Sequence, residues 1–174
     1  VLEQAGIDVE LYDFIANNWD KNKLRELIKQ KNPDFVVFDA TTPSIYSDIE
    51  CAKICKEVSS AKVIFVGTHV SALPEETLKN AQGSIDVIAM GEYDYTIRDI
   101  VQKWPDLNSI DGIVFLEKGV VKFTRKRSLI ENLDLLPFPS RKNINIKHYL
   151  DAGRLYPYIN IFGGRGCPFQ CTFC

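Results

Sequence analysis

The sequence lacks any apolar run long enough to cross a membrane. Its longest runs, such as 35–38 and 63–67, are far shorter than the roughly 20 residues that a spanning helix needs. No charged segment followed by an apolar one opens the chain, so the pattern of a secretion signal is missing as well. These absences predict a soluble, cytoplasmic protein without a membrane partner.

Net charge is also close to zero. The 174 residues include 21 Lys and Arg against 23 Asp and Glu, which leaves a formal net charge of −2. This balance excludes a pervasive electrostatic attraction to nucleic acid or to an anionic membrane. Hydrophobic residues make up 45% of the chain and charged residues 25%, as in one ordinary globular domain with a fragment of a second.

Cysteine is scarce, but three of the five cysteines lie at the end of the chain, at Cys167, Cys171 and Cys174. Such crowding does not suit a disulfide framework. Thiolates are soft ligands for iron–sulfur clusters, zinc or copper(I), and a [4Fe–4S] cluster held by three of them leaves one iron open. A zinc site usually shows paired C-x2-C units or a nearby histidine, and the only histidines are His69 and His148. The spacing therefore favours a cluster, with zinc as the alternative.

Strands and helices alternate along the first part of the chain. Apolar periodicity predicts four strands, at 7–14, 35–39, 62–67 and 86–90. It predicts helices at 21–31, at 45–58, after Pro74 and around 97–104. This alternation predicts an α/β fold with a doubly wound parallel sheet, Rossmann-like and flavodoxin-like. A further strand is expected before Val1, so we expect the sequence to be a piece of a longer protein, cut at both ends.

The alternation ends after Pro105. A glycine turn between two short apolar runs predicts a β-hairpin within 112–124. Pro137 and Pro139 then predict an extended connector. We divide the sequence into an α/β domain over 1–128, a linker over 129–154 and the start of a second domain over 155–174, with a strand at 156–162.

The cysteine segment also carries a specific resemblance. Cys167, Cys171 and Cys174, with Phe173 as the aromatic residue, fit the pattern C-x3-C-x-aromatic-C. In this segment the sequence resembles the radical S-adenosylmethionine enzymes. The resemblance implies that the three cysteines hold a [4Fe–4S] cluster, that its open iron binds S-adenosylmethionine beside Phe173, and that a partial (β/α) barrel begins here. It further implies a small-molecule substrate and an electron donor such as a flavodoxin or ferredoxin.

The residues ahead of the cysteines resemble the cobalamin-binding domain found before the barrel of many of these enzymes. The resemblance is carried by Gly67-Thr68-His69 with Pro74, by 91–95, and by 133–141. Ligands of open α/β sheets bind beyond the carboxyl ends of the strands, where glycine lets the backbone come close to a bulky group and hydroxyls bond its polar edges. The predicted cobalamin-binding residues are therefore those of three strand-end loops: Thr41, Thr42 and Ser44; Gly67, Thr68, His69 and Val70; Gly91, Glu92 and Tyr93.

One part of the cobalamin pattern is absent. The motif D-x-H-x-x-G, which supplies a histidine ligand to cobalt in some cobalamin proteins, does not occur in this sequence. We do not assign His69 to cobalt in its place, because a histidine hydrogen-bonded in a strand-end loop explains it equally well.

Together the two resemblances imply a radical S-adenosylmethionine methyltransferase that uses methylcobalamin to methylate an unactivated carbon or phosphorus. A cobalamin-associated radical cyclase or rearrangement enzyme is the close alternative. Two further hypotheses are a cobalamin- or nucleotide-binding module without chemistry, and an electron-transfer protein whose cluster never binds S-adenosylmethionine. No catalytic residue is assigned, and we expect the piece alone not to be catalytically competent.

Overall fold

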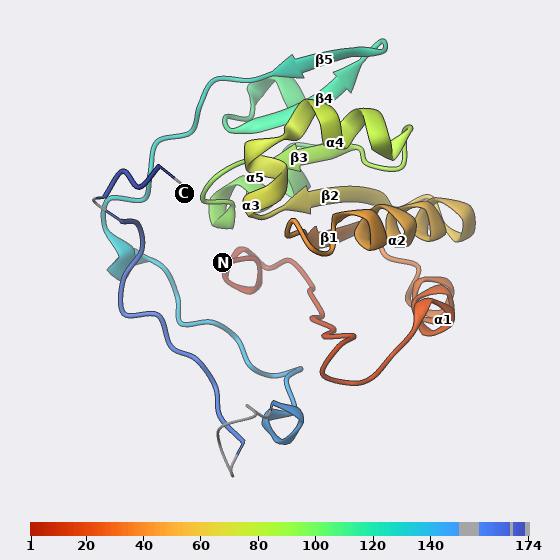
Figure 1. Cartoon of the computed structure of the whole chain (residues 1–174), viewed down its shortest axis with the longest axis vertical. Helices are drawn as coiled ribbons and strands as arrows, with labels where there is room; N and C mark the ends of the chain where they lie inside the picture. The colour runs from red at the N-terminus through yellow and green to blue at the C-terminus, as the bar shows by residue number, and fades with distance from the viewer. Residues whose placement is uncertain (150–156, 168, 173–174) are drawn as a thin grey trace. The chain divides into compact units, whose positions relative to one another are not determined.

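The computed structural model describes residues 1–149, 157–167 and 169–172. It contains a five-stranded sheet in the order β1-β2-β3-β4-β5 (Figure 1). The strands are β1 (Phe35–Asp39), β2 (Lys62–Val66), β3 (Val87–Ala89), β4 (Ile113–Glu117) and β5 (Val120–Phe123). The first three are parallel, β4 is antiparallel to β3, and β5 is antiparallel to β4. The predicted strands at 35–39, 62–67 and 86–90 are confirmed as β1, β2 and β3. The predicted hairpin is confirmed as β4 and β5, which extend the parallel sheet as an antiparallel edge.

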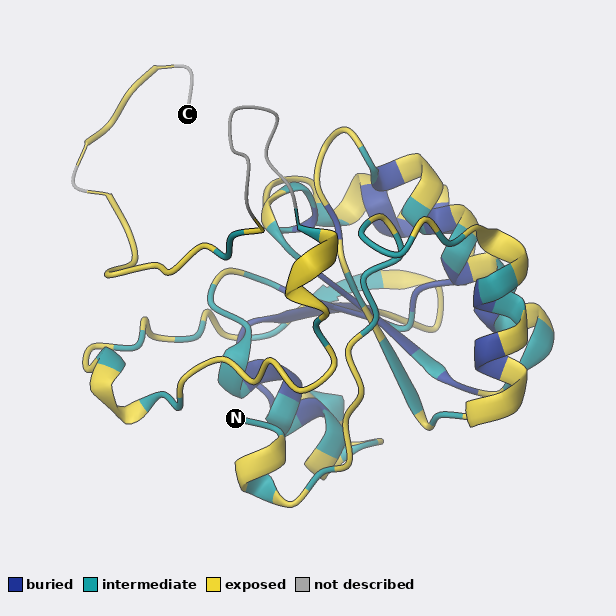
Figure 2. Cartoon of the chain, turned by 90° about the horizontal axis from the view of Figure 1, so that it is seen from below, coloured by how far each residue is buried: buried dark blue, intermediate teal, exposed yellow. Residues whose placement is uncertain are grey.

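Helices lie on both faces of this sheet, which confirms the doubly wound α/β fold (Figure 2). They are α1 (Lys21–Lys31), α2 (Ile45–Val58), α3 (Thr68–Ala72), α4 (Pro74–Ala81) and α5 (Asp94–Lys103). The Asp20 side chain caps α1 by accepting the Lys23 N–H at 3.0 Å, and proline occupies the first position of α4. None of the helices in the described ranges has the length and apolarity that a membrane crossing requires.

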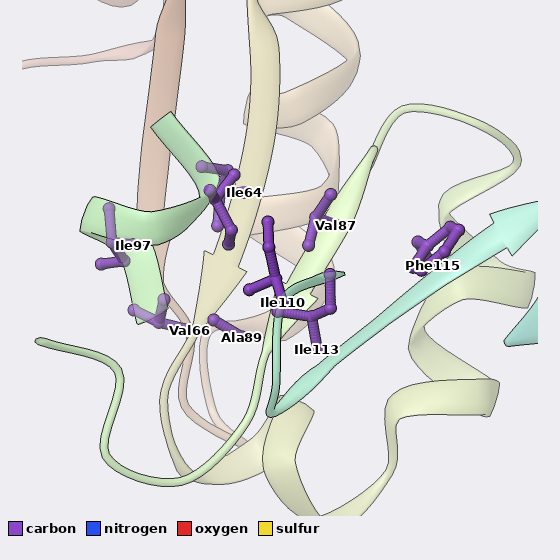
Figure 3. Close-up of a cluster of buried hydrophobic side chains, with 9 residues drawn as sticks. Ile64, Val66, Val87, Ala89, Ile97, Ile110, Ile113 and Phe115 are labelled. Atoms are coloured by element: carbon purple, nitrogen blue, oxygen red, sulfur yellow. The ribbon is translucent and has the colours of Figure 1, made fainter. Parts of the chain in front are cut away.

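The core on one face of the sheet is formed by aliphatic side chains from the strands and from α5. Ile64 and Val66 of β2 point to this face, and Ile97 and Ile100 of α5 pack against it (Figure 3). Ile64 and Ile100 are fully buried. Burying such a side chain stabilises the fold by about 1.5–3 kcal/mol, so this packing fixes the carboxyl ends of the strands.

Asp86 joins β2 and β3 at their amino ends. Its Oδ2 accepts the Val63 N–H at 2.6 Å, where a backbone carbonyl would otherwise be needed. Lys56 of α2 forms an ion pair with Asp86 and donates to the carbonyl of Ala61 at 2.9 Å. The amino edge of the sheet is therefore held by a charged side-chain network.

The predicted strand at 7–14 is wrong. No strand is assigned there, and Val9 and Leu11 are 40% and 54% exposed. Apolar alternation predicts a half-buried surface, but a strand persists only when a ladder satisfies its backbone, and none of the described strands pairs with this segment. At its end, Asp13 instead bonds locally, with Oδ1 accepting the Ala16 N–H at 2.9 Å.

The chain divides into two compact units. The first comprises Val1–Val9 and Trp19–Ile130, and contains the sheet; the second comprises Glu10–Asn18 and Glu131–Cys174. Within the second unit, the Tyr149 hydroxyl donates to Asp13 Oδ2 at 2.7 Å, and His148 Nδ1 lies 3.1 Å from Asn17 Oδ1. These contacts join residues 13–17 to residues 148–149.

The predicted strand at 156–162 is also wrong over its described part. Tyr156 lies outside the described residues, and 157–162 form no strand. Ile161 and Phe162 are 79% and 87% exposed. The apolar side chains of this segment therefore pack on no surface in the described part of the chain, and the alternation alone does not form a strand.

Candidate functional site

The loop after β1 is organised by a pair of hydroxyls. The Thr41 N–H donates to Ser44 Oγ at 3.1 Å, and Thr41 Oγ1 lies 3.0 Å from the same oxygen. Ser44 precedes α2, and its Oγ also approaches the Thr41 carbonyl at 3.3 Å. The hydroxyls predicted from the sequence are therefore gathered at the carboxyl end of β1, where they can donate or accept.

Gly67, directly after β2, makes the closest backbone approach in this region. Its φ of 107° and ψ of −178° lie in a region that essentially only glycine adopts. A Cβ at this position would lie 2.4 Å from Asp39 Oδ1 and 2.6 Å from the Ala40 carbonyl oxygen. The missing side chain therefore lets the ends of β1 and β2 meet without a gap.

The predicted loop at 67–70 is wrong beyond its glycine, because α3 begins at Thr68. Val70 is fully buried in this short helix and belongs to the core, whereas Thr68 is exposed. His69 Nδ1 lies 3.1 Å from Thr42 Oγ1, so this histidine links α3 to the loop after β1. This contact agrees with the expectation of a histidine that is hydrogen-bonded near a strand end, the alternative to cobalt ligation.

The loop after β3 is tied to both of its neighbours. The Gly91 N–H donates to Ser71 Oγ of α3 at 3.0 Å. The Tyr93 hydroxyl donates to Asp39 Oδ2 at 3.4 Å, which reaches across to the end of β1. The loop after β3 is therefore bonded to α3 and to the end of β1, at the carboxyl edge of the parallel strands.

Two carboxylates that the sequence analysis did not select also lie at this edge. Asp39 ends β1, and Asp48 lies one turn into α2 with its Oδ2 buried and without a hydrogen-bond partner among the described residues. Burial raises the pKa of Asp48, and the nearby charge of Asp39 raises it further, against a lowering hydrogen bond from Ser44. The position of Asp39, at the carboxyl end of an apolar strand, could have indicated the first of these carboxylates.

A cleft of about 410 Å³ lies beside the loop after β3. It is lined on one side by Met90, Gly91 and Glu92, and on the other by the last residue of β5, Phe123, with residues 124 and 126–129 after it. We call residues 124–130 the strap, because they run along the start of β4: the Gly112 N–H donates to the Arg125 carbonyl at 2.7 Å.

The strap is fixed by an ion pair between Arg127 and Asp99 of α5. The side chains of Arg127 and Asp99 are only 22% and 13% exposed. Burial alone would raise the pKa of Asp99, but hydrogen bonds from Arg98 and Arg127 outweigh it, and the pKa lies below its ordinary value.

This lowered pKa predicts an acid-sensitive strap. The contribution of Asp99 to stability is complete above its unfolded pKa of about 3.9 and is lost as the pH falls through the lower folded value. In urea unfolding followed by the fluorescence of Trp104, we expect Asp99→Asn to be less stable than the parent protein by about 1–3 kcal/mol at pH 7. The difference should shrink below pH 4; a difference that is constant with pH would contradict the role of the ionised pair.

The cysteine segment shows no assembled metal site in its described part. Cys167 and Cys171 are exposed free thiols, whereas Phe173 and Cys174 lie outside the described residues. Across the described ranges, no group of three or more metal-ligating side chains comes together. The three-cysteine ligand set thus stays a prediction from the spacing.

Known proteins match this chain over most of its length. A family described as "B12 binding domain" matches residues 1–101. An uncharacterized methyltransferase of Pyrococcus horikoshii is 33% identical over 171 residues, which cover 96% of this chain and 37% of that protein. An anaerobic magnesium-protoporphyrin IX monomethyl ester cyclase of Cereibacter sphaeroides is 30% identical over 183 residues, covering 99% of this chain and 29% of that protein.

A solved structure shares the fold. The radical S-adenosylmethionine methyltransferase TsrM of Kitasatospora setae, with cobalamin and a [4Fe–4S] cluster bound, superposes with a TM-score of 0.64 at 17% identity. The match covers 76% of this chain and 25% of TsrM. The chain therefore spans about a quarter to somewhat over a third of the length of these relatives.

Proposed function

The chain belongs to the B12-binding domain family, and on this premise we propose that it holds cobalamin at the carboxyl edge of β1, β2 and β3. The observation that carries the proposal is the close approach of Gly67, directly after β2, to the end of β1, where a Cβ would lie 2.4 Å from Asp39 Oδ1. In open α/β sheets, this edge is where ligands bind.

The donor set at this edge suits cobalamin, whose periphery carries amide groups and a phosphate. Thr41 and Ser44 offer hydroxyls that can donate to a phosphate or accept from an amide. The buried Asp48 Oδ2 accepts no hydrogen bond among the described residues, and a ligand amide N–H is the kind of donor that would satisfy it.

We further propose that the longer protein is a radical S-adenosylmethionine methyltransferase, with Cys167, Cys171 and Cys174 as cluster ligands. Cobalamin would supply the methyl group, and the cluster with S-adenosylmethionine would supply the radical. The role of the chain described here is to bind and orient: the loops after β1, β2 and β3 hold the cobalamin, and the thiolates hold the iron. The methyltransferase relatives support this assignment, and a small-molecule substrate and a flavodoxin- or ferredoxin-type electron donor are part of the proposal.

A radical cyclase is the second candidate. It is supported by the 30% identity to the magnesium-protoporphyrin IX monomethyl ester cyclase, at a coverage of 99% of this chain. The two candidates differ in their products. Methyl transfer would require that cobalamin be remethylated by a second S-adenosylmethionine, which would leave S-adenosylhomocysteine, whereas ring closure would not.

The deciding experiment uses the full-length protein, reconstituted without oxygen with iron, sulfide and cobalamin. We expect bound corrinoid in the visible spectrum and an electron paramagnetic resonance signal of a reduced cluster that shifts when S-adenosylmethionine is added. A cluster that ignores S-adenosylmethionine would leave electron transfer as the function. Absence of corrinoid would remove the cobalamin site, and radical cleavage without S-adenosylhomocysteine would favour the cyclase.

A further inference from the structure

Glu92 connects two parts of the first unit that are far apart in the sequence. Its backbone belongs to the loop after β3, next to Gly91, which bonds α3. Its carboxylate reaches the other way, and Oε2 accepts the Ile130 N–H at 2.7 Å. A single side chain thus ties a strand-end loop to the last residue of the strap.

Ile130 is also the last residue of the first unit, and the chain continues from Glu131 as the second unit. The Ile130 amide is part-buried in its contact with Glu92, so losing the acceptor would leave a donor with a desolvation cost. A hydrogen bond to an ionised carboxylate is about twice as strong as one to a neutral acceptor. The Glu92 carboxylate therefore fixes the position of Ile130, the last residue of the first unit.

We propose that Glu92 is a positioning residue that links the cobalamin-binding edge to the exit of the chain from the α/β unit. The inference rests on the proposed function, since it assigns cobalamin to the loop that carries Glu92. If cobalamin orders the loop after β3, it also orders the amide of Ile130 through Glu92. Because such coupling is reciprocal, a fixed position of Ile130 in turn favours cobalamin binding. The covalent path from Ile130 leads on to Cys167 and Cys171.

The test compares four variants of the full-length protein by hydrogen exchange of residues 128–133. Glu92→Ala removes the acceptor, and Glu92→Asp keeps the charge but shortens the reach by one methylene. Glu92→Gln keeps an oxygen at the same reach, and Glu131→Ala removes a neighbouring exposed carboxylate that makes no hydrogen bond or ion pair within the described residues.

We expect exchange at 128–133 to rise about tenfold in the Glu92→Ala and Glu92→Asp variants, as for loss of one such hydrogen bond. Exchange should rise less in Glu92→Gln, which keeps a neutral acceptor at the same reach, and should stay at the parent level in Glu131→Ala. The buried amides of β2 serve as an internal control, and they should not change. Unchanged exchange in both Glu92→Ala and Glu92→Asp would overturn the proposal, as would an equal rise in Glu131→Ala.

A second arm adds cobalamin. In the parent protein and in Glu92→Gln, cobalamin should slow exchange at 128–133, whereas in Glu92→Ala it should bind without that effect. Cobalamin affinity should fall in Glu92→Ala and be largely restored in Glu92→Gln, because the linkage is reciprocal. If the parent protein binds no cobalamin, the proposed function fails while the apo comparison still decides the Glu92 contact; cobalamin that binds but protects 128–133 equally in Glu92→Ala overturns the linkage.

Discussion

Replacing Gly67 with alanine is expected to destabilise the α/β unit by about 3 kcal/mol or more and to weaken cobalamin binding by at least about tenfold. The backbone angles at Gly67 cost a residue with a side chain about 1–3 kcal/mol. The new Cβ would also lie 2.4 Å from Asp39 Oδ1 and 2.6 Å from a backbone oxygen, and relieving such overlap costs about 1–3 kcal/mol more. Because β1 and its loop must move to relieve it, the edge that binds cobalamin is displaced, and 1.4 kcal/mol there is a factor of ten in affinity.

Gly119 provides the matched control for this substitution. It lies in the turn between β4 and β5 with a φ of 82°, and a Cβ there would meet no atom within 4 Å. Gly119→Ala should therefore cost only the conformational term, about 1 kcal/mol, and leave cobalamin affinity unchanged. Urea unfolding and cobalamin titration of the full-length protein measure both effects. Equal effects of the two substitutions would show that the close approach at Gly67 does not matter.

Replacing Cys171 with alanine is expected to remove the iron–sulfur cluster and with it all cleavage of S-adenosylmethionine. With three thiolates in the ligand set, loss of one leaves two protein ligands, too few to hold a [4Fe–4S] cluster that also has an open iron. Iron content and the visible absorption of the cluster should fall to background in the reconstituted full-length protein. Cobalamin binding should persist, because the cobalamin-binding edge is built from residues of the first unit.

Cys51→Ala is the control. Cys51 lies in α2 as a free thiol, and burial raises its pKa, so it does not present the thiolate that a metal requires. This substitution should change neither iron content nor cleavage. A cluster that survives in Cys171→Ala, or one that is lost equally in Cys51→Ala, would contradict the assignment of the ligand set.

Most of the fold could be predicted because its signals are local. The continuous apolar runs of β1 and β2 indicate strands, and Pro74 marks the start of α4. Burial on both faces, which such runs also predict, holds for β2 but not for β1, which ends the described sheet and leaves Val37 40% exposed. The segment at 7–14 has an equally clear alternation and still forms no strand, because a strand also depends on a partner that its own sequence does not encode.

The geometry of the candidate site could be predicted only in part. The rule that ligands bind at the carboxyl ends of parallel strands led to the candidate edge, and the structure brings the predicted hydroxyls of Thr41 and Ser44 together there. It could not show that Val70 is buried, since α3 begins right after a glycine and is only five residues long. Nor could it show that Glu92 bonds the amide of Ile130, because that contact depends on the path of the strap.

Asp86 has a consequence for how mutations in this domain should sort in a genetic screen. It holds the amino ends of β2 and β3, whereas the hydroxyls and Gly67 lie at the carboxyl ends of the parallel strands. Substitutions at Asp86 or Lys56 should therefore lower the stability of the fold and yield temperature-sensitive alleles. Excess cobalamin should rescue them only by binding to the folded state and so raising its population. Alleles at Thr41 or Ser44 should be insensitive to temperature and dependent on vitamin supply, so the two ends of one sheet would fall into separate phenotypic classes.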